Sequence, residues 1–458
     1  MSPRAVCLVL AVASVVSPLQ AQGRPTPGTP KSFTLPATNS FRLPNGLAVS
    51  LVPYGNVPKV LMQVRVRAGR IHEAADEVWM AELVGDLLKE GTELRDAEAI
   101  AREAGRMGAR LDVEVEQDLA VVGLDGLSEF APRMAALLAD VVGRPTFPAT
   151  QVARVKTDRL RQLSIERSQP EPLGRELFQR LMYPDHPYGR LYPSEERLAA
   201  YTPAQVRSFH AANYGARRAH VYVVGRFERG PTEAAVRKAF GGWKAGRVST
   251  PKPASPVSTG KIHLIDRPGA HQSTLLLGIP VAEPSDQDYV PLLVTNALLG
   301  GSFISRITTN IREDKGYTYS PYSEVSTRTH DAHWVQVADV TTEVTGPSLK
   351  EIRGEIDRLR REPPPTEELK EIQSYVAGLF VLRNSTRAGI AAQLSFLEQQ
   401  GLDRGYLTGF VSRVRSVTPQ QVHRVAQKHL RLEEMTLVLV GDRARVDSQI
   451  KPYGPIAR

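Results

Sequence analysis

A repeated unit of one capped helix and one strand constrains this chain more than any other feature of its sequence. The segment YTPAQVRSFHAANYGARRAHVYVVGRF, which begins at Tyr201, aligns without a gap on VTPQQVHRVAQKHLRLEEMTLVLVGDR, which begins at Val417. In each copy a threonine stands before a proline, the order expected for a helix cap and a first helical turn. The helix then runs into a short β-branched strand that stops at glycine. A gapless match of this length predicts an internal duplication.

The two halves of the chain also follow the same coarse order of elements. With 458 residues, the chain is too long for one hydrophobic core and long enough for two domains. Each half opens with strands, continues through a helix, further strands and long helices, and closes with the repeated unit. This order predicts an α+β fold of two homologous domains, each a mainly antiparallel sheet with helices packed on one face. The expected divisions are a signal peptide (1–21), a Pro-rich lead-in (22–40), an N-terminal domain (41–240), a linker (241–261) and a C-terminal domain (262–458).

The first residues predict an exported protein. A positive charge at Arg4 precedes the apolar run AVCLVLAVASVV, and Ala21 is a small residue at a plausible cleavage point. We therefore expect a cleavable signal peptide, a periplasmic or extracellular location, and no stable membrane anchor. An uncleaved anchor stays open, because Leu19 is large for its place before the cleavage point. Cys7 is the only cysteine and lies in this segment, so the mature chain is expected to have neither disulfides nor a cysteine nucleophile.

The positive net charge of the chain does not indicate a nucleic-acid partner. The formal net charge is +9, but basic residues alternate with acidic ones, as in LKEIRGEIDRLRREPPPTEELKEI. Such a pattern is typical of a solvated helix surface of mixed charge. The sequence also contains no nucleic-acid motif.

Three segments resemble one known family. They are FRLPNGLAVSLVPYGNVPKVLMQVRVRAG, MYPDHPYGRLYPSEERLAAYTPAQVRSFHAANY and LLGGSFISRITTNIREDKGYTYS. Together they resemble the insulinase/pitrilysin-type zinc metallopeptidases, and most closely the short branch that includes bacterial members and the mitochondrial processing peptidases. The resemblance implies two homologous α+β domains that form half of a clam-shell chamber, which a second such subunit closes around unfolded peptides.

The position of the family's zinc motif carries no zinc ligands in this chain. The family uses H-x-x-E-H on a helix, with two histidines on zinc and the glutamate as base for the bound water. At this position the chain has Glu82, Gly85 and Asp86 in place of the three functional residues. The family's further ligand is expected around Arg161 and Gln162, where no carboxylate stands. We therefore expect no metal and no cofactor in this chain, and we interpret Glu82 and Asp86 as polar residues on a partly exposed helix that has lost its metal. A hard-cation site made of the two carboxylates is the alternative.

The resemblance assigns a catalytic role to Arg312 and Tyr319. In the family, an arginine and a tyrosine at this spacing reach toward the substrate near the zinc of the other subunit, where they stabilise developing negative charge. Two alternatives stay open: Arg312 forms an ordinary surface ion pair with a neighbouring acid, and Tyr319 is an interior strand residue. Tyr317, on the other face of the same expected strand, competes for the tyrosine role.

A glycine-rich turn precedes this pair. Gly300, Gly301 and Ser302 match the loop that the family places against the substrate, and backbone amides approach a ligand closely at such a turn. The alternative is that the glycines only terminate a helix.

These observations lead to one functional hypothesis and one alternative. The chain resembles the non-zinc subunit of an exported, heteromeric peptidase, whose partner is a homologous subunit that carries H-x-x-E-H and zinc. The substrates would be unfolded peptides, and whether this chain is an enzyme on its own is left open. The alternative is a catalytically inert peptide-binding or scaffold homologue. A self-sufficient peptidase with an unusual metal site conflicts with Gly85 at the base position.

Overall fold

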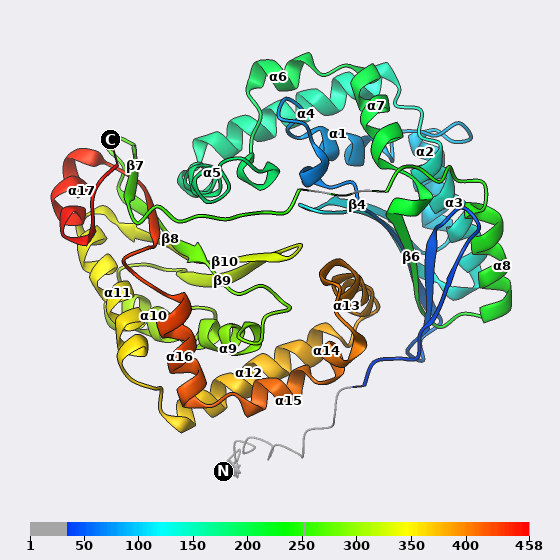
Figure 1. The fold of residues 1–458 in the computed structure, drawn as a ribbon. Helices are drawn as coiled ribbons and strands as arrows, with labels where there is room; N and C mark the ends of the chain where they lie inside the picture. The colour runs from blue at the N-terminus through cyan, green and yellow to red at the C-terminus, as the bar shows by residue number, and fades with distance from the viewer. Residues whose placement is uncertain (1–33, 249, 251, 458) are drawn as a thin grey trace, which may run out of the picture.

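The computed structural model describes residues 34–248, 250 and 252–457, which form two sheets flanked by helices (Figure 1). The predicted signal peptide and Cys7 lie outside these residues. In the part of the chain that is described, no helix combines the length and the apolar character needed to cross a bilayer.

The two sheets share one topology. Among the described residues the strand order is β1-β2-β6-β3-β5-β4 in the first sheet and β7-β11-β8-β10-β9 in the second. Paired strands are antiparallel except for β2 with β6 and β7 with β11, so both sheets carry a parallel pair at the same place. The prediction of two homologous, mainly antiparallel domains is therefore confirmed. The strands are β1 (Asn39–Arg42), β2 (Ala48–Pro53), β3 (Lys59–Val66), β4 (Leu111–Val115), β5 (Ala120–Leu127), β6 (Ala219–Gly225), β7 (Ile262–Asp266), β8 (Gln272–Pro280), β9 (Tyr322–Arg328), β10 (Asp331–Thr341) and β11 (Thr436–Gly441).

Apart from α5 and α13, helices of each domain pack against one face of its own sheet and build the two main cores. The described residues between Phe240 and Ile262 form neither helix nor strand. The α-helices are α1 (Met80–Leu87), α2 (Ala97–Arg106), α3 (Ala131–Gly143), α4 (Ala149–Ser168), α5 (Pro170–Met182), α6 (Glu195–Ala200), α7 (Pro203–Asn213), α8 (Arg229–Phe240), α9 (Tyr289–Leu299), α10 (Arg306–Thr308), α11 (Thr345–Arg361), α12 (Thr366–Arg383), α13 (Arg387–Gln400), α14 (Arg404–Thr408), α15 (Phe410–Ser416), α16 (Pro419–His429) and α17 (Arg443–Ile450). A π-helical turn, η5 (Thr309–Asp314), follows α10.

The repeated unit begins with the same cap in both domains. The Thr202 hydroxyl accepts the Gln205 amide at 3.3 Å, and the Gln205 side chain accepts the Thr202 amide at 2.9 Å. Thr418 and Gln421 repeat this arrangement at 3.2 and 2.8 Å. Both helices therefore start with a capping box, which satisfies amide groups that a helix N-terminus leaves without partners. The cap that the Thr-Pro repeat predicts is confirmed.

The two domains exchange one helix each. Helix α5 of the first domain packs on β8 and β11 of the second sheet, and α13 of the second domain packs on β3 and β6 of the first (Figure 1). Phe178 of α5 fits against Gly278 of β8, where an added Cβ would stand 2.5 Å from the Phe178 ring. Ile390 of α13 is buried with Val224 and Tyr222 of β6. The central strands β3 and β6 of the first sheet and β8 and β11 of the second are thus buried on both faces, a feature that the sequence pattern does not reveal.

Candidate functional site

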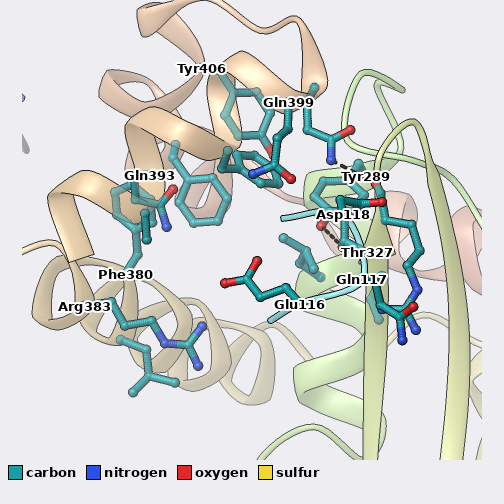
Figure 2. A pocket seen from close by; sticks show the side chains of 18 of the residues that line it. Glu116, Gln117, Asp118, Tyr289, Thr327, Phe380, Arg383, Gln393, Gln399 and Tyr406 are labelled. Atoms are coloured by element: carbon teal, nitrogen blue, oxygen red, sulfur yellow. Dashed lines mark hydrogen bonds between the residues drawn. The ribbon is translucent and has the colours of Figure 1, made fainter. Parts of the chain in front are cut away.

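A cavity of about 770 Å³ lies between the two domains. The first domain contributes the segment at the end of β4, including Val115 and Asp118. The second domain contributes residues of α9, β9, α12, α13 and the α14–α15 region (Figure 2). Two residues that matter elsewhere in the site also border this cavity. Arg70 contacts α1, the helix at the position of the family's zinc motif, and Gly301 belongs to the predicted substrate loop.

Arginines neutralise both carboxylates at the zinc-ligand positions. Glu82 and Asp86 lie one turn apart on α1, as the sequence predicts. The Glu82 side chain is only 4% exposed and forms an ion pair with Arg70. Asp86, 32% exposed, pairs with Arg159 of α4 at 2.7 Å. The expectation of a partly exposed helix is therefore wrong for Glu82. Two guanidinium groups of the same chain now compensate negative charge at these positions.

Helix α4 contacts α1 through Arg159, and not through Arg161 or Gln162, the positions to which the resemblance points. Arg159 reaches Asp86 and donates to the Gln162 side chain at 3.2 Å. Arg161 instead donates to Asp158 at 2.6 Å and is mostly exposed. On this helix, Arg159 is thus the residue that reaches α1; Gln162 lies on the same face, because residues three apart on a helix share a face, and Arg161 points elsewhere.

The base position is closed sterically as well as chemically. A Cβ built on Gly85 would stand 2.5 Å from Cγ2 of Val115, on the edge strand β4. Carbon atoms in contact normally lie about 3.5–4.0 Å apart, so any side chain here must displace Val115. Helix α1 packs against β4 at the place where the side chain of a catalytic glutamate would lie.

A second buried acid lies beside this helix. Glu73 is buried, and its carboxylate accepts the amide of Ala81 at 2.9 Å, near the N-terminus of α1. Burial raises the pKa of Glu73 well above its usual range, and the charge of Glu82 raises it further. Among the described residues, no group of three or more His, Cys, Asp or Glu side chains has the arrangement of a metal site.

The sequence-predicted pair Arg312 and Tyr319 lies together in the structure. The Arg312 guanidinium lies 5.6 Å from the Tyr319 ring centroid and 4.0 Å from that of Phe303, so two aromatic rings flank it. Its Nε also pairs with Glu313 at 3.2 Å, so the expected surface ion pair is present. Tyr319 is 83% exposed and Phe303 66% exposed. The phenol is thus at the surface, whereas the Arg312 side chain is only 23% exposed and is restricted by the two rings and by Glu313.

The tyrosines do not lie on a strand. Strand β9 begins at Tyr322, and Tyr319 lies in a bend before it. The alternative that made Tyr319 an interior strand residue is therefore wrong. The expectation that Tyr317 lies on the other face of the same strand is wrong, because residues two apart share a strand face and because no strand forms here. The Tyr317 amide donates to the Ile311 carbonyl at 2.8 Å, at the end of the π-helical turn.

The glycine-rich turn terminates α9. The amides of Gly300 and Gly301 both donate to the Asn296 carbonyl, at 3.0 and 2.7 Å. These amides are therefore engaged within the chain, as in a helix terminus. Ser302 is buried, and its hydroxyl has no hydrogen-bond partner in the described part of the chain. Gly301 borders the cavity, so substrate contact at this turn stays a prediction.

The segment HPYGR ties loops of the first domain to the interdomain segment. Tyr188 donates to Asp118 at 2.5 Å, and the His186 ring lies 2.9 Å from the Lys252 carbonyl oxygen. Arg190 donates to the Glu73 carbonyl at 2.9 Å. This motif thus ties the β4–β5 turn, the interdomain segment and the Glu73 loop together, and its role in the structure is architectural.

Sequence reasoning missed Arg70, Arg159 and the cavity lining. Arg70 precedes α1 by a loop and Arg159 lies on a separate helix, so no motif spacing marks either one. A search for basic residues facing Asp86 from the third-ligand helix would have found Arg159, since the resemblance already places that helix opposite α1.

Two family models match successive parts of the chain. The model described as insulinase, peptidase family M16, matches residues 52–191, and the model of the peptidase M16 inactive domain matches residues 200–376.

Curated relatives are similar over about three fifths of the chain. An uncharacterized zinc protease of Mycobacterium leprae is 28% identical over 285 residues, which are 61% of this chain and 64% of that protein. One of Bacillus subtilis is 26% identical over 282 residues, which are 61% and 68% of the two chains. The matched part thus spans about two thirds of the length of these relatives.

Solved structures match almost the whole fold. A peptidase M16 inactive domain from Pseudomonas fluorescens has a TM-score of 0.81 and 26% identity, covering 88% of this chain and 98% of that one. A protease from Helicobacter pylori has a TM-score of 0.81 at 19% identity, covering 89% and 100%. The second match supports the fold alone.

Proposed function

Because this chain belongs to the insulinase family of peptidases, family M16, we propose that it is the non-zinc-binding subunit of an exported, heteromeric metallopeptidase that degrades unfolded peptides. The observation that carries the proposal is the arrangement around α1. Arg70 and Arg159 neutralise the two acids at the ligand positions, and Val115 closes the base position.

The proposed partner is a homologous subunit that holds zinc through H-x-x-E-H. Zinc in that subunit would supply the Lewis acid and the acidic water that peptide hydrolysis needs. This chain would supply Arg312 and Tyr319 from its second domain. A peptide carbonyl under attack develops negative charge on its oxygen, and a guanidinium and a phenol hydroxyl are suitable donors to it. Flanking by Phe303 and Tyr319 restricts the arginine before substrate arrives, which favours catalysis by reducing the cost of ordering it.

Reconstitution tests the proposal. This chain and an H-x-x-E-H homologue from the same genome would be purified separately, and cleavage of an unfolded fluorogenic peptide measured for each alone and for the mixture. We expect no activity from this chain, and chelator-sensitive activity in the mixture that exceeds that of the partner alone. Zinc-dependent cleavage by this chain alone would overturn the proposal. A mixture no faster than the partner alone would instead favour the inert peptide-binding or scaffold homologue.

A further inference from the structure

A cluster of arginines surrounds a second, smaller cavity, which we call the arginine pocket. It lies where the ends of β3 and α13 meet the start of β6, and its volume is about 70 Å³. That volume has room for about five water-sized groups, which suits a tetrahedral oxyanion. The arginines that border the pocket are Arg42, Arg65, Arg67, Arg217 and Arg218. Among the described residues that border it, Glu398 is the only acid.

Two of these arginines are buried and have only neutral partners. Arg65 is 9% exposed and Arg218 is 7% exposed. Nε of Arg218 donates to the Arg67 carbonyl at 2.9 Å, and Arg65 donates to the Gln63 side chain at 3.1 Å. In the part of the chain that the structure describes, neither guanidinium forms an ion pair with an acid. Burying a charge without a counter-charge is costly, so the pair favours an anion from outside the chain.

The acid that borders the pocket does not supply this counter-charge. The Glu398 carboxylate pairs with Arg67 at 3.2 Å and with His220 at 2.6 Å. It also accepts a hydrogen bond from the Tyr222 hydroxyl at 2.9 Å. Its charge is therefore already shared among three donors, and the pocket keeps an excess of positive charge.

The remaining arginines have donors to offer to a ligand. The Arg217 side chain is exposed and makes no hydrogen bond or ion pair with the described residues, and Arg42 donates to the Gly46 carbonyl at 3.2 Å. Burial and the charge of Arg67 lower the pKa of Arg218 to about 10, so Arg218 is still a cation at neutral pH. Planar guanidinium groups bind phosphate oxygens in pairs, so this cluster is suited to a phosphate group.

We propose that the arginine pocket binds a phosphate group, either as free inorganic phosphate or as the terminal phosphate of an organic ester. Arg65 and Arg218 hold it from the buried side, and Arg67 and Arg217 complete the site from the exposed side. A dianion compensates more of the excess charge than a carboxylate does. This binding site goes beyond the proposed peptidase function and does not depend on it.

Calorimetric titration of the intact, isolated chain in a phosphate-free buffer of constant ionic strength tests the site. The probes are inorganic phosphate, glycerol 1-phosphate and acetate. We expect saturable binding of phosphate that is about tenfold or more tighter than that of acetate, as for additional charge-assisted hydrogen bonds. Similar affinity for glycerol 1-phosphate would identify a phosphate ester as a ligand, whereas binding of inorganic phosphate without the ester would identify the free ion. Equal affinity for phosphate and acetate, or no saturable binding of any probe, would overturn the proposal.

Substitutions locate the bound anion. Arg217→Gln removes a donor without breaking a contact among the described residues, and should weaken phosphate binding about tenfold or more. Arg415→Gln removes the same charge from an exposed position of α15 that does not border the pocket, and should leave binding unchanged. Arg218→Lys keeps the charge but loses the planar fork, and should also weaken binding. Equal weakening by Arg217→Gln and Arg415→Gln would overturn the site, because the effect would then come from net charge. Binding is measured without a partner subunit, so this failure is distinct from that of the proposed function, which the mixed-subunit cleavage assay decides.

Discussion

Helix α1 and the segment from Phe303 to Tyr319 both carry residues that the family resemblance singles out, but they bury their polar groups to different depths. On α1, the Glu82 side chain is 4% exposed and its charge is compensated by Arg70 inside the protein. In the second domain, Arg312 is 23% exposed and pairs with Glu313, and the Tyr319 ring beside it is 83% exposed. A buried charge such as Glu82 depends on its internal partner, whereas an exposed phenol such as Tyr319 stays accessible from outside the chain.

Removing Arg70 should have the largest effect on stability. Arg70→Met leaves the Glu82 carboxylate buried without a counter-charge, and breaking such a pair costs about 3–5 kcal/mol of unfolding free energy. Urea denaturation would measure it. The double variant Arg70→Met/Glu82→Gln should recover most of the loss, because the buried charge is gone.

Arg159→Met is the matched control for this comparison. Asp86 is 32% exposed, so water compensates it, and the loss should be about 1 kcal/mol or less. Equal losses of unfolding free energy in Arg70→Met and Arg159→Met would contradict the inference that Glu82 depends on its arginine more than Asp86 does.

Arg312→Ala should leave stability nearly unchanged and act on catalysis instead. In the mixed-subunit assay we expect kcat to fall about 10²–10³-fold, the usual effect of losing one donor to a developing oxyanion. Arg312→Lys should restore little, since lysine lacks the planar fork and the stacking on Phe303. Arg415→Ala, at an exposed arginine of α15, is the control. An unchanged rate for Arg312→Ala would break the contrast between the two regions.

Gly85→Ala should be destabilising although alanine favours helices. The methyl group would meet Val115, and overpacking of this kind costs about 1–3 kcal/mol. Gly354→Ala, within α11 of the second domain, has open space at the same atom and should gain up to about 1 kcal/mol. Thermal unfolding of the two variants compares them directly. A stabilising Gly85→Ala would show that α1 still has room for a base.

The smallest expected effect is a pH dependence at Glu73. Its pKa is raised in the folded protein by burial and by Glu82, so the folded state holds this proton to higher pH than the unfolded chain. This contribution to stability is complete below the unfolded pKa of about 4.3 and is lost as pH rises through the folded pKa. The melting temperature of Glu73→Gln should therefore gain on wild type as pH rises.

Glu398 provides a control of opposite sign. Burial works to raise its pKa, but hydrogen bonds from His220 and Tyr222 outweigh burial and lower the pKa to about 2. The stability that Glu398 supplies is present above about pH 4.3 and is lost as pH falls toward its folded pKa. Glu398→Gln should thus cost most near neutral pH and little in acid. The same trend for both variants would contradict these assignments.

The fold was predictable because duplication left a direct record in the sequence. Thr202 and Thr418 mark the same capped helix twice, and each cap forms as the Thr-Pro spacing predicts. The helix exchange was not predictable in this way. Residues such as Phe178 and Ile390 read as ordinary apolar positions, and only tertiary packing decides which of two similar sheets they cover.

The candidate site was predictable in its residue types but not in its contacts. The absence of histidines at positions 82 and 86 follows from the sequence alone. That Arg70 and Arg159 take up the charge depends on loop and helix positions that no local pattern specifies. The strand expected around Tyr319 was wrong because the π-helical turn and Gly316, at φ +65°, shift the chain before β9 begins.

The exchange of α5 and α13 determines what a cut between the domains would do. A protease that cleaves within residues 241–261 would produce two fragments, and each fragment would carry the helix that covers the other fragment's sheet. Separation would expose apolar surface on both fragments at once, so the nicked molecule should migrate as one particle until it is denatured. Neither fragment would be expected to persist as a well-behaved protein when expressed by itself.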